Sequence, residues 1–238
     1  MRMIVERLFK SREEMIAAVR EDCLTALQQA IEERGEATFL LSGGSSPEPV
    51  YKSLSEVDID WSSVYVGLVD ERWVDFNHDK SNEAFIARTL LQNKAASANL
   101  IGMKNSAETA AEGLADCESA YQQLAQPFDV TILGMGPDGH TASFFPHAHG
   151  LEAALNPESK KLCAAIIAKQ SEVTGTATER MTLTLNGLLQ SRHLMLLITG
   201  EEKLKVFREA QAGNDVAAVP VRAVIQQEQV PLIVYWAP

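Results

Sequence analysis

Short apolar runs of five to seven residues recur along the chain and are separated by longer polar stretches. Runs of this length, in which nearly every residue is apolar, predict strands that are buried on both faces of a sheet. We expect strands over residues 37–42, 64–70, 128–134, 161–167, 181–185, 193–199 and 231–236.

Between these runs, apolar residues return every three or four positions, which is the period of an amphipathic helix. The pattern predicts helices over 11–34, 81–92, 106–125 and 201–210. The first is framed by Ser11 and Glu14, a capping-box pair, and by Gly35, which suits a helix C-terminus.

Strands and helices that alternate in this way indicate an α/β fold, in which a mostly parallel sheet is covered by helices on both faces. No linker, repeat or low-complexity segment interrupts the pattern, so we expect one domain over residues 1–238. Ligands of such sheets bind beyond the carboxyl ends of the strands. The residues that follow each strand are therefore the candidate site.

Charge changes this picture in one respect. The 238 residues include 21 Lys and Arg and 32 Asp and Glu, a formal net charge of −11. Such an acidic chain is unsuited to broad nucleic-acid binding, which needs a basic face. If the substrate is an anion, the field of the whole protein repels it, so an anion site has to be local.

The remaining composition points to the cytoplasm. The N-terminal residues do not resemble a signal peptide, and no apolar run approaches the ~20 residues that span a bilayer. Cys23, Cys117 and Cys163 have no metal-binding spacing, and we expect them to be free buried thiols in a reducing compartment.

Two strand ends carry candidate anion-binding groups. Residues 42–47 read SGGSSP, in which Gly43 and Gly44 let backbone N–H groups turn towards one anion. Pro47 suits the first position of a following helix, whose dipole would favour the same anion. Residues 70–72 read DER, and Arg72 is able to hold a carboxylate, phosphate or carbonyl oxygen. A plain turn and a structural ion pair are the alternatives.

A third strand end, GMGPDGHT over 134–141, holds a candidate general base. Its glycines match GxGxxG, but Pro146 comes too soon for the long helix of a dinucleotide site. His140, beside Asp138 on a glycine-rich backbone, is suited to proton transfer near neutral pH. His147 and His149 form an HxH pair without a clear third ligand, so we predict no metal site.

Two cations follow later strands. Arg180 opens the strand at 181–185, and Lys203 lies in the first turn of the helix at 201–210. A cation at a helix N-terminus opposes the helix dipole, which makes better sense if an anion binds there. Neutralisation of Lys203 by its acidic neighbours is the alternative.

The motifs SGGSSP, VDERWV with SNE, GMGPDGHTASFFP, ERMTLT and TGEEK occur in an order that resembles the 6-phosphogluconolactonase family, from about residue 5 to 236. The resemblance implies a Rossmann-like fold of the glucosamine-6-phosphate isomerase, ribose-5-phosphate isomerase and CoA-transferase type. It implies hydrolysis of 6-phospho-D-glucono-1,5-lactone in the oxidative pentose phosphate pathway, by a cytoplasmic monomer or weak homo-oligomer that needs no metal or organic cofactor.

The resemblance also implies a role for each motif residue. Gly43, Gly44 and Ser45 would cradle the substrate phosphate, and Arg180 and Lys203 would add charge to it. Arg72 would orient the lactone. His140 would be the general base, with Asp138 and Asp70 in supporting positions.

Two other functions are compatible with the same fold. A related aminosugar-phosphate deaminase would use Asp70 as a proton shuttle, although the HTASFFP segment is closer to the lactonase form. A sugar-phosphate sensor would keep the pocket without turnover, but such sensors carry a DNA-binding segment and no basic helix-turn-helix pattern is visible here.

Overall fold

Seven strands form one parallel sheet in the computed structural model, which describes residues 3–238. The central strands are the most buried, since every residue of β2 and β6 is buried. Across the sheet, the order is β1 (Ile4–Leu8), β10 (Leu232–Ala237), β9 (Ser191–Thr199), β6 (Phe128–Leu133), β2 (Ala37–Leu41), β3 (Val64–Leu68) and β5 (Asn99–Leu100).

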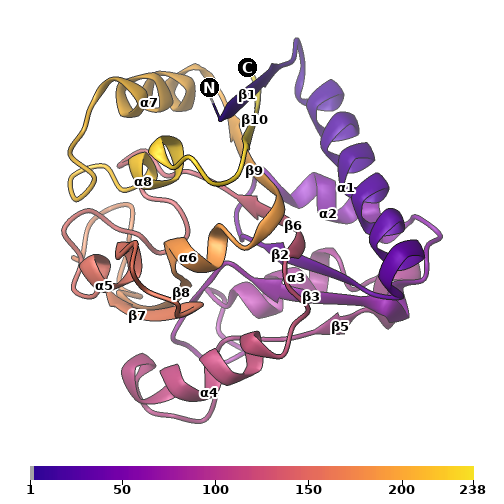
Figure 1. The fold of residues 1–238 in the computed structure, drawn as a ribbon, viewed down its shortest axis with the longest axis horizontal. Coiled ribbons are helices and arrows are strands. Elements are labelled where there is room, and N and C mark those ends of the chain that lie inside the picture. The colour runs from indigo at the N-terminus through magenta and orange to yellow at the C-terminus, as the bar shows by residue number, and fades with distance from the viewer. Residues whose placement is uncertain (1–2) are drawn as a thin grey trace.

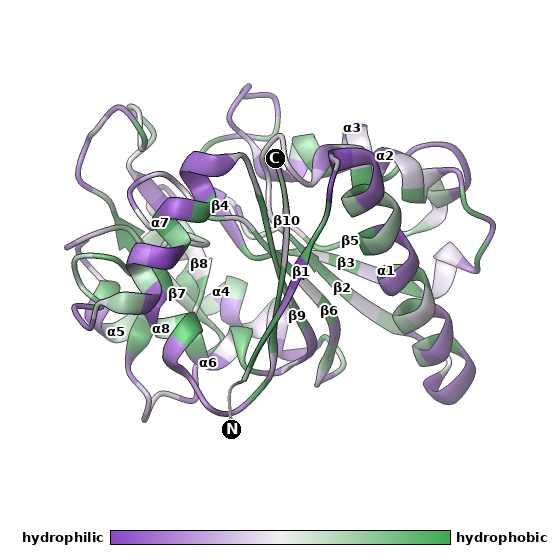
Figure 2. Cartoon of the chain, turned by 90° about the horizontal axis from the view of Figure 1, so that it is seen from above, coloured by the Kyte–Doolittle hydropathy of each residue, from purple (hydrophilic) through white to green (hydrophobic). Residues whose placement is uncertain are grey.

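Helices cover both faces of this sheet, as expected for a parallel sheet. Figure 2 shows α1 and α2 on one side, with α4, α6, α7 and α8 on the other. The helices are α1 (Arg12–Arg34), α2 (Glu48–Ser55), α3 (Asn82–Thr89), α4 (Ala110–Gln122), α5 (Leu151–Leu155), α6 (Leu185–Leu188), α7 (Glu201–Ala212) and α8 (Val221–Gln226). None of them, within residues 3–238, has the length and apolar character needed to cross a membrane.

A second, smaller sheet corrects part of the sequence-based picture. β4 (Asp70–Arg72), β8 (Glu179–Leu183) and β7 (Cys163–Ile167) pair antiparallel and lie apart from the large sheet. Strands thus form close to the expected ranges 161–167 and 181–185, but they do not belong to the parallel sheet. The second is also shifted, because it ends at Leu183, Thr184 caps α6 and Leu185 is the first residue of that helix. Figure 1 shows β7 and β8 beside α5, with α4 below them.

Local signals in the sequence account for the first helix. The Ser11 side chain accepts a hydrogen bond from the Glu14 backbone N–H at 3.2 Å, which caps α1. Gly35 follows with φ of 79°, a left-handed conformation that glycine adopts without strain. Buried residues such as Met15, Val19 and Leu27 then face the sheet.

The order of the strands places one crevice. From β2 the chain proceeds outward through β3 to β5, whereas from β6 it proceeds through β9 to β10 in the opposite direction. Neighbouring strands whose connections diverge in this way leave a gap between their carboxyl ends, where open α/β sheets bind ligands. Here that gap lies between β2 and β6.

Candidate active site

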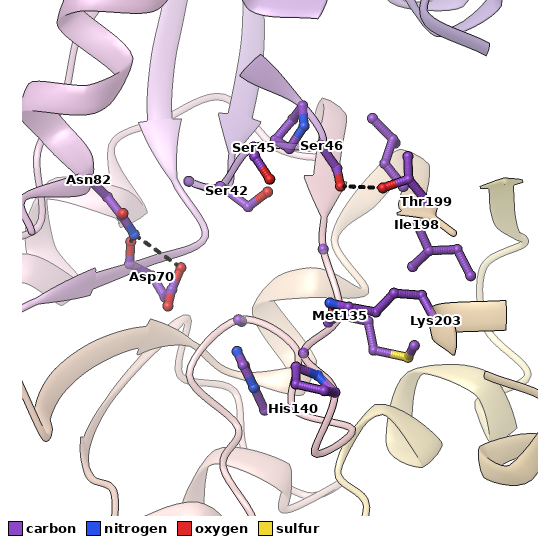
Figure 3. A pocket seen from close by; sticks show the side chains of 18 of the residues that line it. Ser42, Ser45, Ser46, Asp70, Asn82, Met135, His140, Ile198, Thr199 and Lys203 are labelled. Carbon is purple, nitrogen blue, oxygen red and sulfur yellow. Dashed lines mark hydrogen bonds between the residues drawn. The ribbon is translucent and has the colours of Figure 1, made fainter. Parts of the chain in front are cut away.

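A cavity of about 290 Å³ lies at the carboxyl ends of β2, β6 and β9. It occupies the crevice between β2 and β6, and the small sheet forms part of its wall. Eight of the nine residues proposed from the sequence line it: Gly43, Gly44, Ser45, Asp70, Arg72, His140, Arg180 and Lys203. The ninth, Asp138, is not part of the lining but contacts the ring nitrogen Nδ1 of His140. Figure 3 shows His140, Lys203 and Asp70 around the same space.

The glycine-rich loop after β2 turns sharply into α2. Gly44 has φ of 108°, which an L side chain rarely adopts, and Pro47 precedes the first residue of the helix. The Ser46 hydroxyl lies 3.2 Å from the Thr199 hydroxyl, which ties this loop to the end of β9. The loop thus presents its backbone and serine hydroxyls to the cavity.

His140 is held in one orientation by Asp138. Its ring nitrogen Nδ1 lies 2.5 Å from Asp138 Oδ1, and its backbone N–H donates to the same oxygen at 3.0 Å. The ring stacks on Phe145 with centroids 4.3 Å apart. Burial would raise the pKa of Asp138, but its hydrogen bonds with His140 and the charge of that ring outweigh burial and lower the pKa.

Glycines make this geometry possible. A Cβ on Gly136 would lie 2.1 Å from the His140 ring, and Gly139 has φ of 80°. The glycines of this segment are therefore needed to position His140, and they do not form a binding site for a dinucleotide pyrophosphate.

The short strand β4 brings Asp70 and Arg72 to the cavity. Because side chains alternate along a strand, both lie on one face and Glu71 on the other. The Ser143 hydroxyl donates to Asp70 Oδ2 at 2.7 Å. Arg72 Nη1 donates to the Lys80 carbonyl and to Asn82 Oδ1, each at 3.0 Å.

Glu71 anchors the first turn of α3 to β4. Its side chain is fully buried and accepts backbone N–H groups of Arg72, Asn82 and Glu83 at 2.7–2.8 Å. Burial raises the pKa of Glu71 to about 7, although these three hydrogen bonds favour the carboxylate.

Arg180 and Lys203 approach the cavity from different elements. Arg180, on β8, is 3% exposed, donates through Nε to the Ala177 carbonyl at 2.6 Å and lies over the Phe145 ring. Burial lowers the pKa of Arg180 to about 10, with the charge of Asp70 opposing that change. Lys203, on α7, donates to the Met135 carbonyl, and burial lowers its pKa as well.

The cavity is thus lined by three cations, Arg72, Arg180 and Lys203, against one carboxylate, Asp70. This local excess of positive charge in a chain of net charge −11 is what an anion site requires. His147 and His149 line a different surface depression. Within residues 3–238, no cluster of three His, Cys, Asp or Glu side chains is arranged to hold a metal ion.

Sequence reasoning missed three residues of this network. Asn82, Ser143 and Glu71 contact Asp70 or Arg72 but received no role, although the first lies in SNE and the second in HTASFFP. A polar residue in the first turn of a predicted helix gives no periodic signal. Only the position of α3 beside β4 reveals what Asn82 does.

Comparison with known proteins agrees with this geometry. A family model described as glucosamine-6-phosphate isomerases/6-phosphogluconolactonase matches residues 10–234. The chain belongs to this family. A 6-phosphogluconolactonase of Rhizobium meliloti is 39% identical over 97% of both chains. One from Pseudomonas putida is 37% identical over 94% of this chain and 89% of its own length.

Solved structures of the family show the same fold. A 6-phosphogluconolactonase from Shewanella baltica superposes with a TM-score of 0.92 at 38% identity, covering 99% of this chain and 98% of the other. A monomeric glucosamine-6-phosphate deaminase reaches a TM-score of 0.74 at 17% identity, over 98% of this chain and 96% of its own. The second likeness concerns the fold alone. The Rossmann-like α/β class predicted from the sequence is confirmed.

Proposed function

We propose that this protein hydrolyses 6-phospho-D-glucono-1,5-lactone to 6-phospho-D-gluconate, the second step of the oxidative pentose phosphate pathway. The observation that carries the proposal is the His140–Asp138 pair, at 2.5 Å, in a cavity whose other groups suit a phosphate. The relatives named above are 6-phosphogluconolactonases that align over nearly their whole length. The substrate class is therefore a small phosphosugar lactone.

His140 acts as the general base. A δ-lactone is an activated ester, so a water molecule attacks C1 without a protein nucleophile. With Nδ1 engaged by Asp138, the Nε2 atom takes the proton from the attacking water. The Asp138 carboxylate fixes the tautomer and stabilises the imidazolium that forms, as a carboxylate does behind a catalytic histidine.

Arg72 stabilises the charge that develops on the carbonyl oxygen. The alternative donors are backbone N–H groups of residues 136–139, but each of these N–H groups already has an acceptor. Gly136 N–H donates to the His140 carbonyl, Gly139 N–H to the Gly136 carbonyl, and Asp138 N–H to its own carboxylate. Pro137 has no N–H. The Arg72 guanidinium keeps donors that no protein group uses, because only its Nη1 has a partner among residues 3–238.

The substrate phosphate is held at the glycine-rich loop after β2. Gly43, Gly44 and Ser45 supply backbone and hydroxyl donors, and Lys203 and Arg180 supply charge. Binding of the phosphate, which is not the reacting part of the substrate, orients the lactone for attack and gives specificity for a phosphorylated sugar.

The same fold is compatible with a deaminase, in which Asp70 would shuttle a proton. Here Asp70 Oδ2 is engaged by Ser143, and the Asn82 amide lies 3.5 Å from Oδ1. A carboxylate held on both sides is suited to positioning and charge balance. We therefore assign Asp70 a supporting role and keep lactone hydrolysis.

The three cysteines are free and buried, which supports a cytoplasmic protein. We further infer a single domain over residues 1–238 that acts as a monomer or weak homo-oligomer, with no nucleic-acid or membrane partner. The match of the family model to residues 10–234 supports the domain assignment.

A coupled assay tests the proposed function. Glucose 6-phosphate is oxidised by its dehydrogenase, and 6-phosphogluconate dehydrogenase then reports each hydrolysed lactone as NADPH. The protein should accelerate the second NADPH step above spontaneous hydrolysis. His140→Asn should abolish most of that acceleration, whereas His147→Asn, a histidine outside the cavity, should retain it. No acceleration by the wild-type protein would refute the proposal.

A further inference from the structure

Asp70 and Arg72 are two residues apart on β4, so a carboxylate and a guanidinium share one face of a strand. Opposite charges in such positions are expected to pair. Among residues 3–238, however, the ion pairs do not include one between Asp70 and Arg72. Another group in the structure therefore keeps the Asp70 carboxylate and the Arg72 guanidinium apart.

The side-chain amide of Asn82 lies between them. Its Oδ1 accepts from Arg72 Nη1 at 3.0 Å, and its Nδ2 donates to the Asp70 carbonyl oxygen at 3.1 Å and approaches Asp70 Oδ1 at 3.5 Å. The amide has only one orientation that suits both neighbours, because the acceptor has to face the cation and the donor the carboxylate. Figure 3 shows Asn82 pointing to Asp70 at the wall of the cavity.

Asn82 has little freedom to leave this place. It is 5% exposed, and its backbone N–H donates to Glu71 Oε1 at 2.7 Å. Ser81 caps α3 immediately before it. On its remaining side, Gly43 packs so closely that a Cβ there would lie 2.4 Å from Asn82 Oδ1.

We propose that Asn82 is a positioning residue, a neutral spacer that hydrogen-bonds both charges and prevents Arg72 from pairing with Asp70. The guanidinium then lines the cavity with Nε and Nη2 donors that have no partner among residues 3–238, as a substrate oxygen requires. A direct pair would consume those donors and neutralise the cation. The benefit to catalysis rests on the proposed function, whereas the separation of the two charges does not.

Two kinds of measurement test this role. The first needs no ligand. A crystal structure of Asn82→Ala should show the Arg72 guanidinium moved into a direct ion pair with Asp70. An unmoved Arg72 in that structure would overturn the proposal. Should Asn82→Ala fold poorly, Asn82→Asp serves instead, because it has the same shape and should pair with Arg72 itself.

The second measurement is binding of 6-phosphogluconate and of inorganic phosphate by calorimetry. Asn82→Ala should weaken 6-phosphogluconate by about 10- to 100-fold, the loss expected for one charged hydrogen-bonding partner, and leave inorganic phosphate unchanged. Adding Asp70→Asn should restore most of the lost affinity in Asn82→Ala but not in Asn82→Asp. A merely structural role predicts no such rescue.

Asn105→Ala is the matched control. Asn105 also bonds on two sides, to the Gly113 carbonyl at 2.9 Å and from the Ala107 N–H at 3.1 Å, but it does not line the cavity. The Asn105→Ala protein should bind 6-phosphogluconate and inorganic phosphate with the affinities of the wild type. Equal loss of 6-phosphogluconate in Asn105→Ala, or no recovery on adding Asp70→Asn to Asn82→Ala, would contradict the spacer. Failure of the wild type to bind 6-phosphogluconate would instead count against the proposed function, and the crystal structure would still decide the spacer.

Discussion

Gly43→Ala is a one-carbon change that should disturb the cavity wall out of proportion to its size. The new Cβ would lie 2.4 Å from Asn82 Oδ1 and 3.0 Å from Asn82 Cγ. Contacts under 3.0 Å essentially never occur for a real Cβ, so either the loop or the amide has to move. The backbone of Gly43 is not left-handed, which means that the effect comes from the contact and not from backbone strain.

The magnitude follows from what Asn82 would lose by moving. Its bond from the Arg72 guanidinium is worth about 1.5–3 kcal/mol and its bond to the Asp70 carbonyl about 0.5–1.5 kcal/mol. The free energy of unfolding should therefore fall by about 2–4.5 kcal/mol. For a chain of this length, that loss corresponds to a drop in Tm of roughly 4–18 °C.

Urea denaturation of Gly43→Ala and wild type, with the slope of each transition compared, measures this loss. Gly134→Ala is the matched control, because Gly134 also lines the cavity, has no left-handed backbone and has no atom within 4 Å of the added Cβ. Its free energy of unfolding should stay within about 1 kcal/mol of wild type. If Gly43→Ala proved as stable as Gly134→Ala, the packing of Gly43 against Asn82 would not constrain the site, and our reasoning would fail.

Other predictions concern chemistry, binding and pH. His140→Asn should lower kcat by about 10²- to 10⁴-fold in the coupled assay and leave the affinity for inorganic phosphate unchanged; a retained kcat would exclude His140 as the base. Lys203→Met and Arg180→Lys should mainly raise KM for the phosphosugar, and an unchanged KM in both would remove these residues from the phosphate site. Burial raises the pKa of Glu71 to about 7, whereas in the unfolded chain the pKa of this side chain is 4.5. Between these two pH values, the folded protein therefore holds a proton on Glu71 that the unfolded chain has lost. The free energy of unfolding should hence rise as pH falls from about 7 to about 4.5, and denaturation of Glu71→Gln over that range should show a flatter profile; identical profiles would contradict this interpretation.

Much of the parallel sheet was predictable because its strands are buried on both faces. Apolar runs such as 128–134 leave little choice of structure. The edge strand β1 was missed because its sequence, IVERL, mixes two charged residues with apolar ones over only five positions. β4 was missed for a related reason: it is three charged residues long, and it becomes a strand only by pairing with β8, over a hundred residues later.

The site divides in the same way. The glycine-rich loops at Gly43 and at His140 could be recognised in the sequence, because backbone conformations with positive φ require glycine. Asn82 and Ser143 left none, since their importance depends on which elements the fold brings beside β4. The residues with evident chemistry or unusual backbone were therefore predictable from the sequence, whereas the residues that position them were not.

The contrast between a cationic cavity and a chain of net charge −11 has a consequence for release of the product. Under the proposed function, the substrate carries only the charge of its phosphate, and hydrolysis adds a carboxylate. The long-range repulsion of the protein therefore acts more strongly on the outgoing molecule than on the incoming one. The acidic remainder of the chain therefore opposes retention of the product more than it opposes arrival of the substrate. It offsets part of the stronger attraction that the cations of the cavity exert on the more highly charged product.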